Sequence, residues 1–193
     1  HVAALKHLVE AGCDVNQAAK NGTTPVYIAA SNGHVAAIEV LVKAPMGCDV
    51  NQAANGGATA AHVAAQEGHT AALELLVKAP MGCDLNQAAA SDGRTPAYAA
   101  ALEGRTAALQ VLVEAPGCDL NLADKDGATP LFATTKEGHC AALELLIGAG
   151  CDVNRMANEG WRPAHLAAQE GHTAALELLA KAGCDVNQGT DDG

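Results

Sequence analysis

Apolar residues along the chain recur with the three- and four-residue spacing of short amphipathic helices. The segment 141–147, Ala-Ala-Leu-Glu-Leu-Leu-Ile, follows this spacing, and it predicts a helix with one buried face that ends near Gly150. A shorter helix is predicted ahead of it. Thr129 suits the N-cap of that helix, Pro130 suits its first turn, and Gly138 suits its end.

The same order of elements repeats along the chain. The phrase Gly-Cys-Asp-(Val/Leu)-Asn recurs at intervals of 35, 35, 35, 33 and 33 residues, placing Cys13, Cys48, Cys83, Cys118, Cys151 and Cys184. Gly-x-Thr-Pro and Gly-His phrases recur in register with it. A fixed period of 20–50 residues indicates stacked repeats, each one supersecondary unit. Because neither helix of a unit is long enough to be stable alone, each unit depends on its neighbours.

These phrases resemble the ankyrin repeat, which has a period of about 33 residues and a Thr-Pro-Leu-His-x-Ala phrase. The matching residues include Thr24-Pro25, Thr95-Pro96, the phrase 162–168 and five Gly-His or Gly-Arg pairs. The resemblance extends over essentially residues 1–193. It implies an all-α, ankyrin-type helical solenoid with short hairpin arms. Two departures are that Ala60 replaces the proline of one unit and that Arg162 replaces the threonine of another.

The phrases divide the chain into five complete repeats with partial repeats at both ends. The predicted boundaries are 1–19 (partial), 20–54, 55–90, 91–123, 124–157, 158–188 and 189–193 (partial). Insertions at 44–47, 79–82 and 115–117, and one residue around Ala90, fall between helices, where the fold tolerates them. We expect the natural protein to continue beyond both ends.

Charge and composition narrow the possible functions. The net charge is −11 and the pI is near 5.0, which argues against a nucleic-acid partner and against an anionic membrane surface. The sequence contains no apolar run of the length that a membrane span needs. Six of the seven cysteines follow the repeat spacing, and only Cys140 does not. Seven unpaired thiols suit a reducing compartment, so we expect an intracellular, cytoplasmic or nuclear, monomeric protein.

No motif in the chain predicts catalysis, a cofactor or a metal site. Cysteines in neighbouring repeats are expected to be too far apart to form a disulfide or share a zinc ion. The histidines of the Gly-His phrases, together with His62 and His165, are expected to bond the backbone between turns, as in the ankyrin resemblance. The sequence has no phosphate-binding loop and no nucleophile elbow. We therefore expect a protein that is not an enzyme.

In ankyrin arrays, the hairpin tips and the exposed side of the first helices form a concave groove that binds partners. The matching positions here vary between repeats, and the third to fifth complete repeats carry the most diverse side chains. The predicted partner-binding residues are Arg94, Leu102, Lys125, Asp126, Lys136, Glu159, Trp161 and Gln169. Trp161 is the sharpest candidate, because tryptophan is enriched in binding hot spots. The alternative is that Trp161 packs on the adjacent hairpin.

The resemblance therefore favours a non-catalytic scaffold that binds a protein partner. Two alternatives stay open: a regulatory ankyrin segment of a larger enzyme or channel, and an engineered or consensus-like array without a natural partner. The resemblance also implies modification by an asparaginyl hydroxylase, which acts on the asparagine of Asp-Val-Asn when a leucine lies eight residues upstream. Asn16, Asn154 and Asn187 keep that spacing, whereas Asn51, Asn86 and Asn121 do not.

Overall fold

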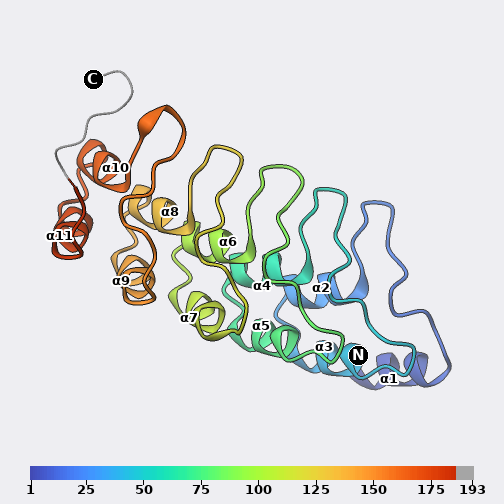
Figure 1. Ribbon diagram of the computed structural model, residues 1–193. Coiled ribbons are helices and arrows are strands. Elements are labelled where there is room, and N and C mark those ends of the chain that lie inside the picture. Colours follow the sequence, from blue (N-terminus) through green and yellow to red (C-terminus); the bar gives the residue numbers. More distant parts are fainter. Residues whose placement is uncertain (186–193) are drawn as a thin grey trace.

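The computed structural model describes residues 1–185, which form eleven α-helices and one 3-10 helix and contain no strand. The elements are α1 (Val2–Glu10), α2 (Pro25–Ser31), α3 (Val35–Val42), α4 (Ala60–Glu67), α5 (Thr70–Val77), α6 (Pro96–Leu102), α7 (Thr106–Glu114), α8 (Pro130–Lys136), α9 (Cys140–Gly148), η1 (Asn158–Gly160), α10 (Pro163–Gln169) and α11 (Thr173–Lys181). After α1 the helices form five pairs. Figure 1 shows these pairs stacked side by side, with long loops projecting from one side of the stack. The all-helical solenoid expected from the repeats is confirmed.

Each pair consists of an inner helix (α2, α4, α6, α8 or α10) and an outer helix that follows it. Threonine caps the start of most inner helices: the hydroxyl oxygen of Thr95 accepts a hydrogen bond from the Tyr98 N–H at 3.3 Å. The repeat without proline still begins its helix at Ala60, because His62 Nδ1 accepts from the Thr59 N–H at 3.0 Å. The missing proline therefore does not move the start of the helix.

The core runs the length of the stack between the two rows of helices. Each of four consecutive outer helices contributes two large aliphatic side chains that are 0–2% exposed: Ile38, Leu41, Leu73, Leu76, Leu109, Leu112, Leu143 and Leu146. Buried alanines of the inner helices, such as Ala65 and Ala101, fill the facing positions. Because these alanines are small, helices of neighbouring repeats pack closely, and the core needs few aromatic residues.

Within residues 1–185, the asparagine of each Gly-Cys-Asp-(Val/Leu)-Asn phrase links one repeat to the next. The Asn51 amide donates to the Gly82 carbonyl at 3.0 Å and accepts from the Asp84 N–H at 2.8 Å. Asn86 makes the corresponding bonds to Gly117 and Asp119, both at 2.8 Å. These two repeats carry the inserted turns, so the insertions leave the asparagine contacts intact.

Three of the four Gly-His histidines also bond the backbone of the preceding repeat, as predicted. His69 Nε2 lies 3.2 Å from the Ser31 carbonyl, His139 Nε2 lies 3.1 Å from the Leu102 carbonyl, and His172 Nε2 lies 3.0 Å from the Lys136 carbonyl. Arg105 takes this position in the third complete repeat, and its Nε donates to the Gln66 carbonyl at 3.0 Å. The role of these side chains is therefore structural.

The seven cysteines all lie in the described part of the chain, and all are free thiols. Cys48 and Cys151 are buried, whereas Cys13 is exposed. Burial, together with a neighbouring aspartate, raises the pKa of the Cys48 thiol and of the Cys151 thiol to about 11. These buried cysteines fill small core positions, as the repeat spacing predicts.

Candidate functional site

The hairpin arms and the inner helices border one side of the stack, which we call the groove face (Figure 1). Adjacent hairpins are joined by a single backbone hydrogen bond at each step, from Asn55 N–H to Asn21 carbonyl, Ser91 to Gly56, Lys125 to Asp92 and Asn158 to Asp126, at 2.9–3.2 Å. These bonds align the hairpins, so equivalent positions of successive repeats form rows along the groove face.

One cavity on the groove face lies between α4 and α6, under the hairpin of the third complete repeat. It has a volume of about 250 Å³ and is lined by Ala58, His62, Gln66, Ala89, Ser91, Asp92, Arg94, Ala99, Leu102 and Glu103. We call it the α4–α6 cavity. It brings together two of the predicted partner-binding residues, Arg94 and Leu102, whereas the other predicted residues do not line it.

The hairpin above this cavity is larger than the others. The backbone bond that closes it runs from Ala89 N–H to the Arg94 carbonyl, with four residues between, whereas the preceding hairpin closes from Ala54 to Ala58, with three between. The inserted residue around Ala90 therefore widens the turn at this repeat. Arg94 is the first residue after the glycine of this enlarged turn, and Ala58 holds the equivalent position one repeat earlier.

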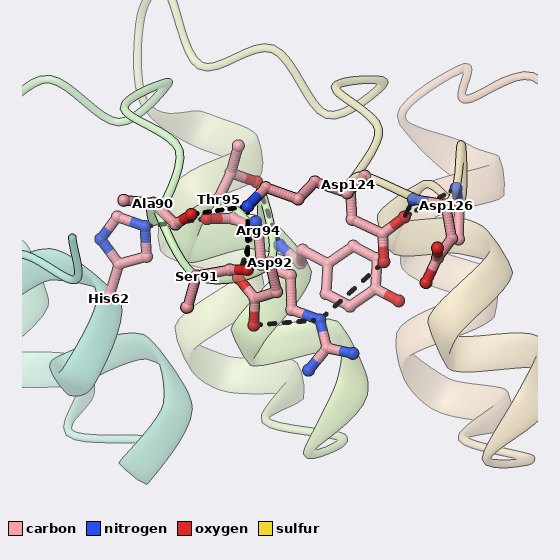
Figure 2. A network of polar contacts seen from close by, with 11 residues as sticks. His62, Ala90, Ser91, Asp92, Arg94, Thr95, Asp124 and Asp126 are labelled. Atoms are coloured by element: carbon pink, nitrogen blue, oxygen red, sulfur yellow. Dashed lines mark hydrogen bonds and ion pairs between the residues drawn. The ribbon is translucent and has the colours of Figure 1, made fainter. Parts of the chain in front are cut away.

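Arg94 is held by groups on both sides. Its Nε lies 3.5 Å from Asp92 Oδ2 and 3.9 Å from Asp124 Oδ2, and its guanidinium carbon lies 4.9 Å from the centre of the Tyr98 ring (Figure 2). The Asp124 side chain is only 4% exposed and accepts from the Ala128 N–H at 3.0 Å. Burial and the Asp124 carboxylate raise the pKa of Tyr98 above its ordinary value.

Trp161 occupies the same position in the fifth complete repeat as Arg94 does in the third. Its half-buried ring meets the His165 ring edge to face, with 6.2 Å between centroids and an interplanar angle of 81°. Arg94 and Trp161 thus each pack on the ring at the third position of their own inner helix. In the repeat between them, the small and buried Ala128 holds the equivalent position.

The other predicted partner-binding residues lie along the same face. Lys125 Nζ donates to the carbonyls of Ala90 and Ser91 at 2.6 and 2.9 Å, so it fastens the enlarged hairpin to its neighbour. The Leu102 side chain is half-buried against the core. The remaining residues, Asp126, Lys136, Glu159 and Gln169, are exposed. Glu159 is the one non-glycine among the described residues with a positive φ, 59°.

The lining residues not predicted from the sequence as binding residues include three titratable ones: His62, Asp92 and Glu103. His62 Nδ1 accepts the Thr59 N–H, so its Nε2 donates to the Arg94 carbonyl at 3.0 Å, and burial lowers the pKa of this histidine. The extra residue near Ala90 was the available signal, since it breaks the repeat at the hairpin that covers these side chains.

The predicted hydroxylation sites lie at the repeat junctions, away from the α4–α6 cavity. Asn16 bonds Gly47 and Asp49 at 3.0 and 2.8 Å, and Asn154 bonds Gly183 and Asp185 at 3.5 and 2.8 Å. Asn187 lies outside the described residues.

Neither a metal cluster nor a membrane helix is found in residues 1–185. No group of three or more histidine, cysteine or acidic side chains there has the arrangement of a metal site. No helix in that range is both long and apolar enough to cross a bilayer.

The fold and the groove face define the class of helical repeat proteins whose units pair an inner and an outer helix below a hairpin. The family model of ankyrin repeats (3 copies) matches residues 1–89, 39–124, 79–157 and 97–190, so the chain belongs to the ankyrin repeat family. None of the curated proteins compared with the chain matches it.

Among solved structures, the chain is similar to the crystal structure of the ankyrin repeat domain of Bcl-3, described as a unique member of the IkappaB protein family. The TM-score is 0.87 at 22% sequence identity, and the alignment covers 99% of this chain and 83% of that one. At this identity, the likeness supports the fold alone. Ankyrin repeat domains are generally protein–protein interaction modules.

Proposed function

We propose that this array is a non-catalytic scaffold that binds a protein partner through the groove face, centred on the third to fifth complete repeats. The observation that carries the proposal is that three departures from the repeat meet at one place. The enlarged hairpin, Arg94 and Leu102 all border the α4–α6 cavity. Substitutions and insertions needed only for stacking have no reason to gather on one face.

The composition of the groove face also supports a protein partner. Arg94 and Trp161 are of the residue types enriched at interface hot spots, and exposed polar residues surround them. Both side chains are already oriented by an aromatic neighbour, Tyr98 for Arg94 and His165 for Trp161. Such orientation reduces the conformational entropy that is lost when a partner binds.

The proposal is tested by affinity capture with the wild-type array, Trp161→Ala, and Glu144→Gln as the control on the exposed surface of α9. A bound protein is then titrated against all three. We expect Trp161→Ala to weaken binding more than tenfold, the effect of removing about 2 kcal/mol at a hot spot, while the array remains folded. Glu144→Gln should bind as wild type does.

Melting temperatures measured on the same samples distinguish a binding role of Trp161 from a purely structural one. If Trp161 serves only to brace its hairpin against His165, Trp161→Ala lowers the melting temperature and leaves the affinity unchanged. A partner that binds all three proteins equally would place the interface elsewhere and contradict the groove assignment.

A further inference from the structure

We propose that the α4–α6 cavity receives one basic side chain, a lysine or an arginine, of the protein partner. This inference rests on the proposed function, and it adds the chemistry of the residue that the partner inserts between the second and third complete repeats.

The size of the cavity favours a single side chain. Its volume of about 250 Å³ lies below the roughly 300–1,000 Å³ of sites that enclose a small molecule. The cavity opens on the groove face between two inner helices, where a partner segment lying along the hairpins passes over it. One long side chain can reach into it from such a segment.

The lining has an apolar wall that suits the methylene stem of such a side chain. Ala99 and the half-buried Leu102 lie on the α6 side, and Ala58 lies at the base of the preceding hairpin. Lysine and arginine bury their aliphatic stems along apolar surfaces while the charged group stays near water or a counter-ion. Leu102 is the one apolar residue in its row, whose other members are Ser31, Gln66, Lys136 and Gln169.

The charged side chains that line the cavity favour a cation, because two of them are carboxylates and one is a guanidinium group. Asp92 and Glu103 line it, and Asp124 lies behind Arg94. The single positive charge of Arg94 faces both Asp92 and Asp124, and Glu103 adds a third carboxylate. Arg105 and Lys125 lie outside the lining, where they bond the carbonyl of Gln66 and the carbonyls of Ala90 and Ser91. Counted with them and with Asp124, the surroundings hold three carboxylates and three cations, whereas within the lining itself two carboxylates face one guanidinium group. His62 donates its Nε2 proton to the Arg94 carbonyl, and burial keeps its pKa low, so the ring adds no charge near pH 7.

Glu103 is the carboxylate that is free to pair with the partner. It is exposed at the C-terminal end of α6, and within residues 1–185 no hydrogen bond or ion pair occupies its side chain. Asp92, in contrast, already accepts from the Arg94 N–H at 3.1 Å and faces the Arg94 guanidinium. Glu137 holds the same position at the end of α8 and is also exposed, but it does not line the cavity.

This pair of glutamates provides a matched experiment. The 193-residue chain is used to select binders from a phage-displayed library of random 12-residue peptides. We expect the selected peptides to share one lysine or arginine. Replacing that residue by norleucine should weaken binding to the wild-type array about two- to fivefold, the range of a solvent-accessible ion pair. Glu103→Gln should remove this dependence, whereas Glu137→Gln should retain it.

The possible outcomes distinguish the proposal for the α4–α6 cavity from the proposed function of the groove face. Peptides that lack a shared basic residue, or that lose affinity equally with Glu103→Gln and Glu137→Gln, would overturn the basic-side-chain proposal. If such peptides still depend on Trp161, the proposed groove function survives without this specificity. If the selected peptides instead share an acidic residue whose contribution to binding depends on Arg94, the cavity binds an anion and the proposal is wrong. A library that yields no peptide dependent on the groove face counts against both proposals.

Discussion

The role of a residue in this array depends on whether it follows the repeat pattern or departs from it. The cysteines, the Gly-His histidines and the asparagines keep it, and each contacts its own repeat or the neighbouring one. Arg94 and Trp161 break it, and each is packed on a ring of its own inner helix. A residue that follows the period is therefore explained by stacking, whereas a large residue that departs from it is a candidate for binding.

The burial of the thiols gives a prediction at this scale. Cys13 is exposed, whereas Cys48 and Cys151 are buried and their thiol pKa values are raised to about 11. Because the thiolate is the nucleophile, iodoacetamide at pH 7.5 should modify Cys13 first and these two only on unfolding. Peptide mapping by mass spectrometry after timed quenching measures the order. Equal rates at Cys13 and Cys48 in the folded protein would contradict the burial of the core cysteines.

Asparagine hydroxylation is a second prediction for single residues. Treated with an asparaginyl hydroxylase, the array should be modified at Asn16, Asn154 and Asn187 in preference to Asn51. Asn16 and Asn51 make the same two kinds of bond at nearly the same distances, so their local contacts do not distinguish them. The expected preference comes from the leucine spacing alone. Peptide mapping measures it, and equal modification of Asn51 and Asn154 would refute it.

Helices and loops in this chain acquire stability from the elements beside them. An inner helix of seven or eight residues is far below the length at which isolated helices persist in water. Threonine caps begin most of these helices, and buried leucines and alanines hold them in place. The loops between repeats are held in turn by side-chain amides that bond the next backbone, so each loop serves as part of an interface.

The asparagine contacts predict unequal costs for one substitution at two repeats. Asn86 makes two junction bonds of 2.8 Å, whereas Asn121 accepts one bond from the Asp152 N–H at 3.3 Å. Asn86→Ala should lower the free energy of unfolding by about 1–2 kcal/mol, and Asn121→Ala by less. Urea titrations followed by circular dichroism compare the two. A larger loss at Asn121 would show that these bonds do not set junction stability.

The whole molecule is a line of near-equivalent units, so position along the line matters as much as residue type. Leu8 and Leu41 hold equivalent positions in α1 and α3, yet Leu8 is 53% exposed and Leu41 is 2% exposed. The difference arises because α3 is covered by its own inner helix, α2, and by the next repeat. No inner helix covers α1 within the described residues.

This contrast gives a prediction for the array as a whole. Leu41→Ala should lower the free energy of unfolding by about 2–5 kcal/mol, the usual cost of truncating a fully buried leucine. The same substitution at Leu8 should cost less than about 1 kcal/mol, since much of the side chain already contacts water. Parallel urea titrations test the pair. Similar losses at both positions would mean that α1 is covered in solution.

The fold could be predicted from the sequence because the same phrases recur in each repeat, and each phrase indicates the same local structure. Thr24-Pro25 and Thr95-Pro96, for example, both mark the start of an inner helix, and each does so in the structure. The α4–α6 cavity could not be predicted in this way. It depends on how one extra hairpin residue redirects Arg94 and on which carboxylates then face it. Periodicity shows where the pattern breaks, but only the packed structure shows which side chains meet there.

The single backbone bond between neighbouring hairpins has a mechanical consequence. Every substantial helix contact joins elements of the same or the adjacent repeat. Each pair of neighbouring hairpins shares one backbone bond, to which Asn55 and Lys125 add side-chain bonds at two of the junctions. Under tension applied along the stack, load passes through one junction after another and no contact spans several of them. The array should therefore behave as a linear elastic element that extends slightly at each junction between repeats. At higher force, repeats should detach one after another from an end, and the array should not unfold in a single step.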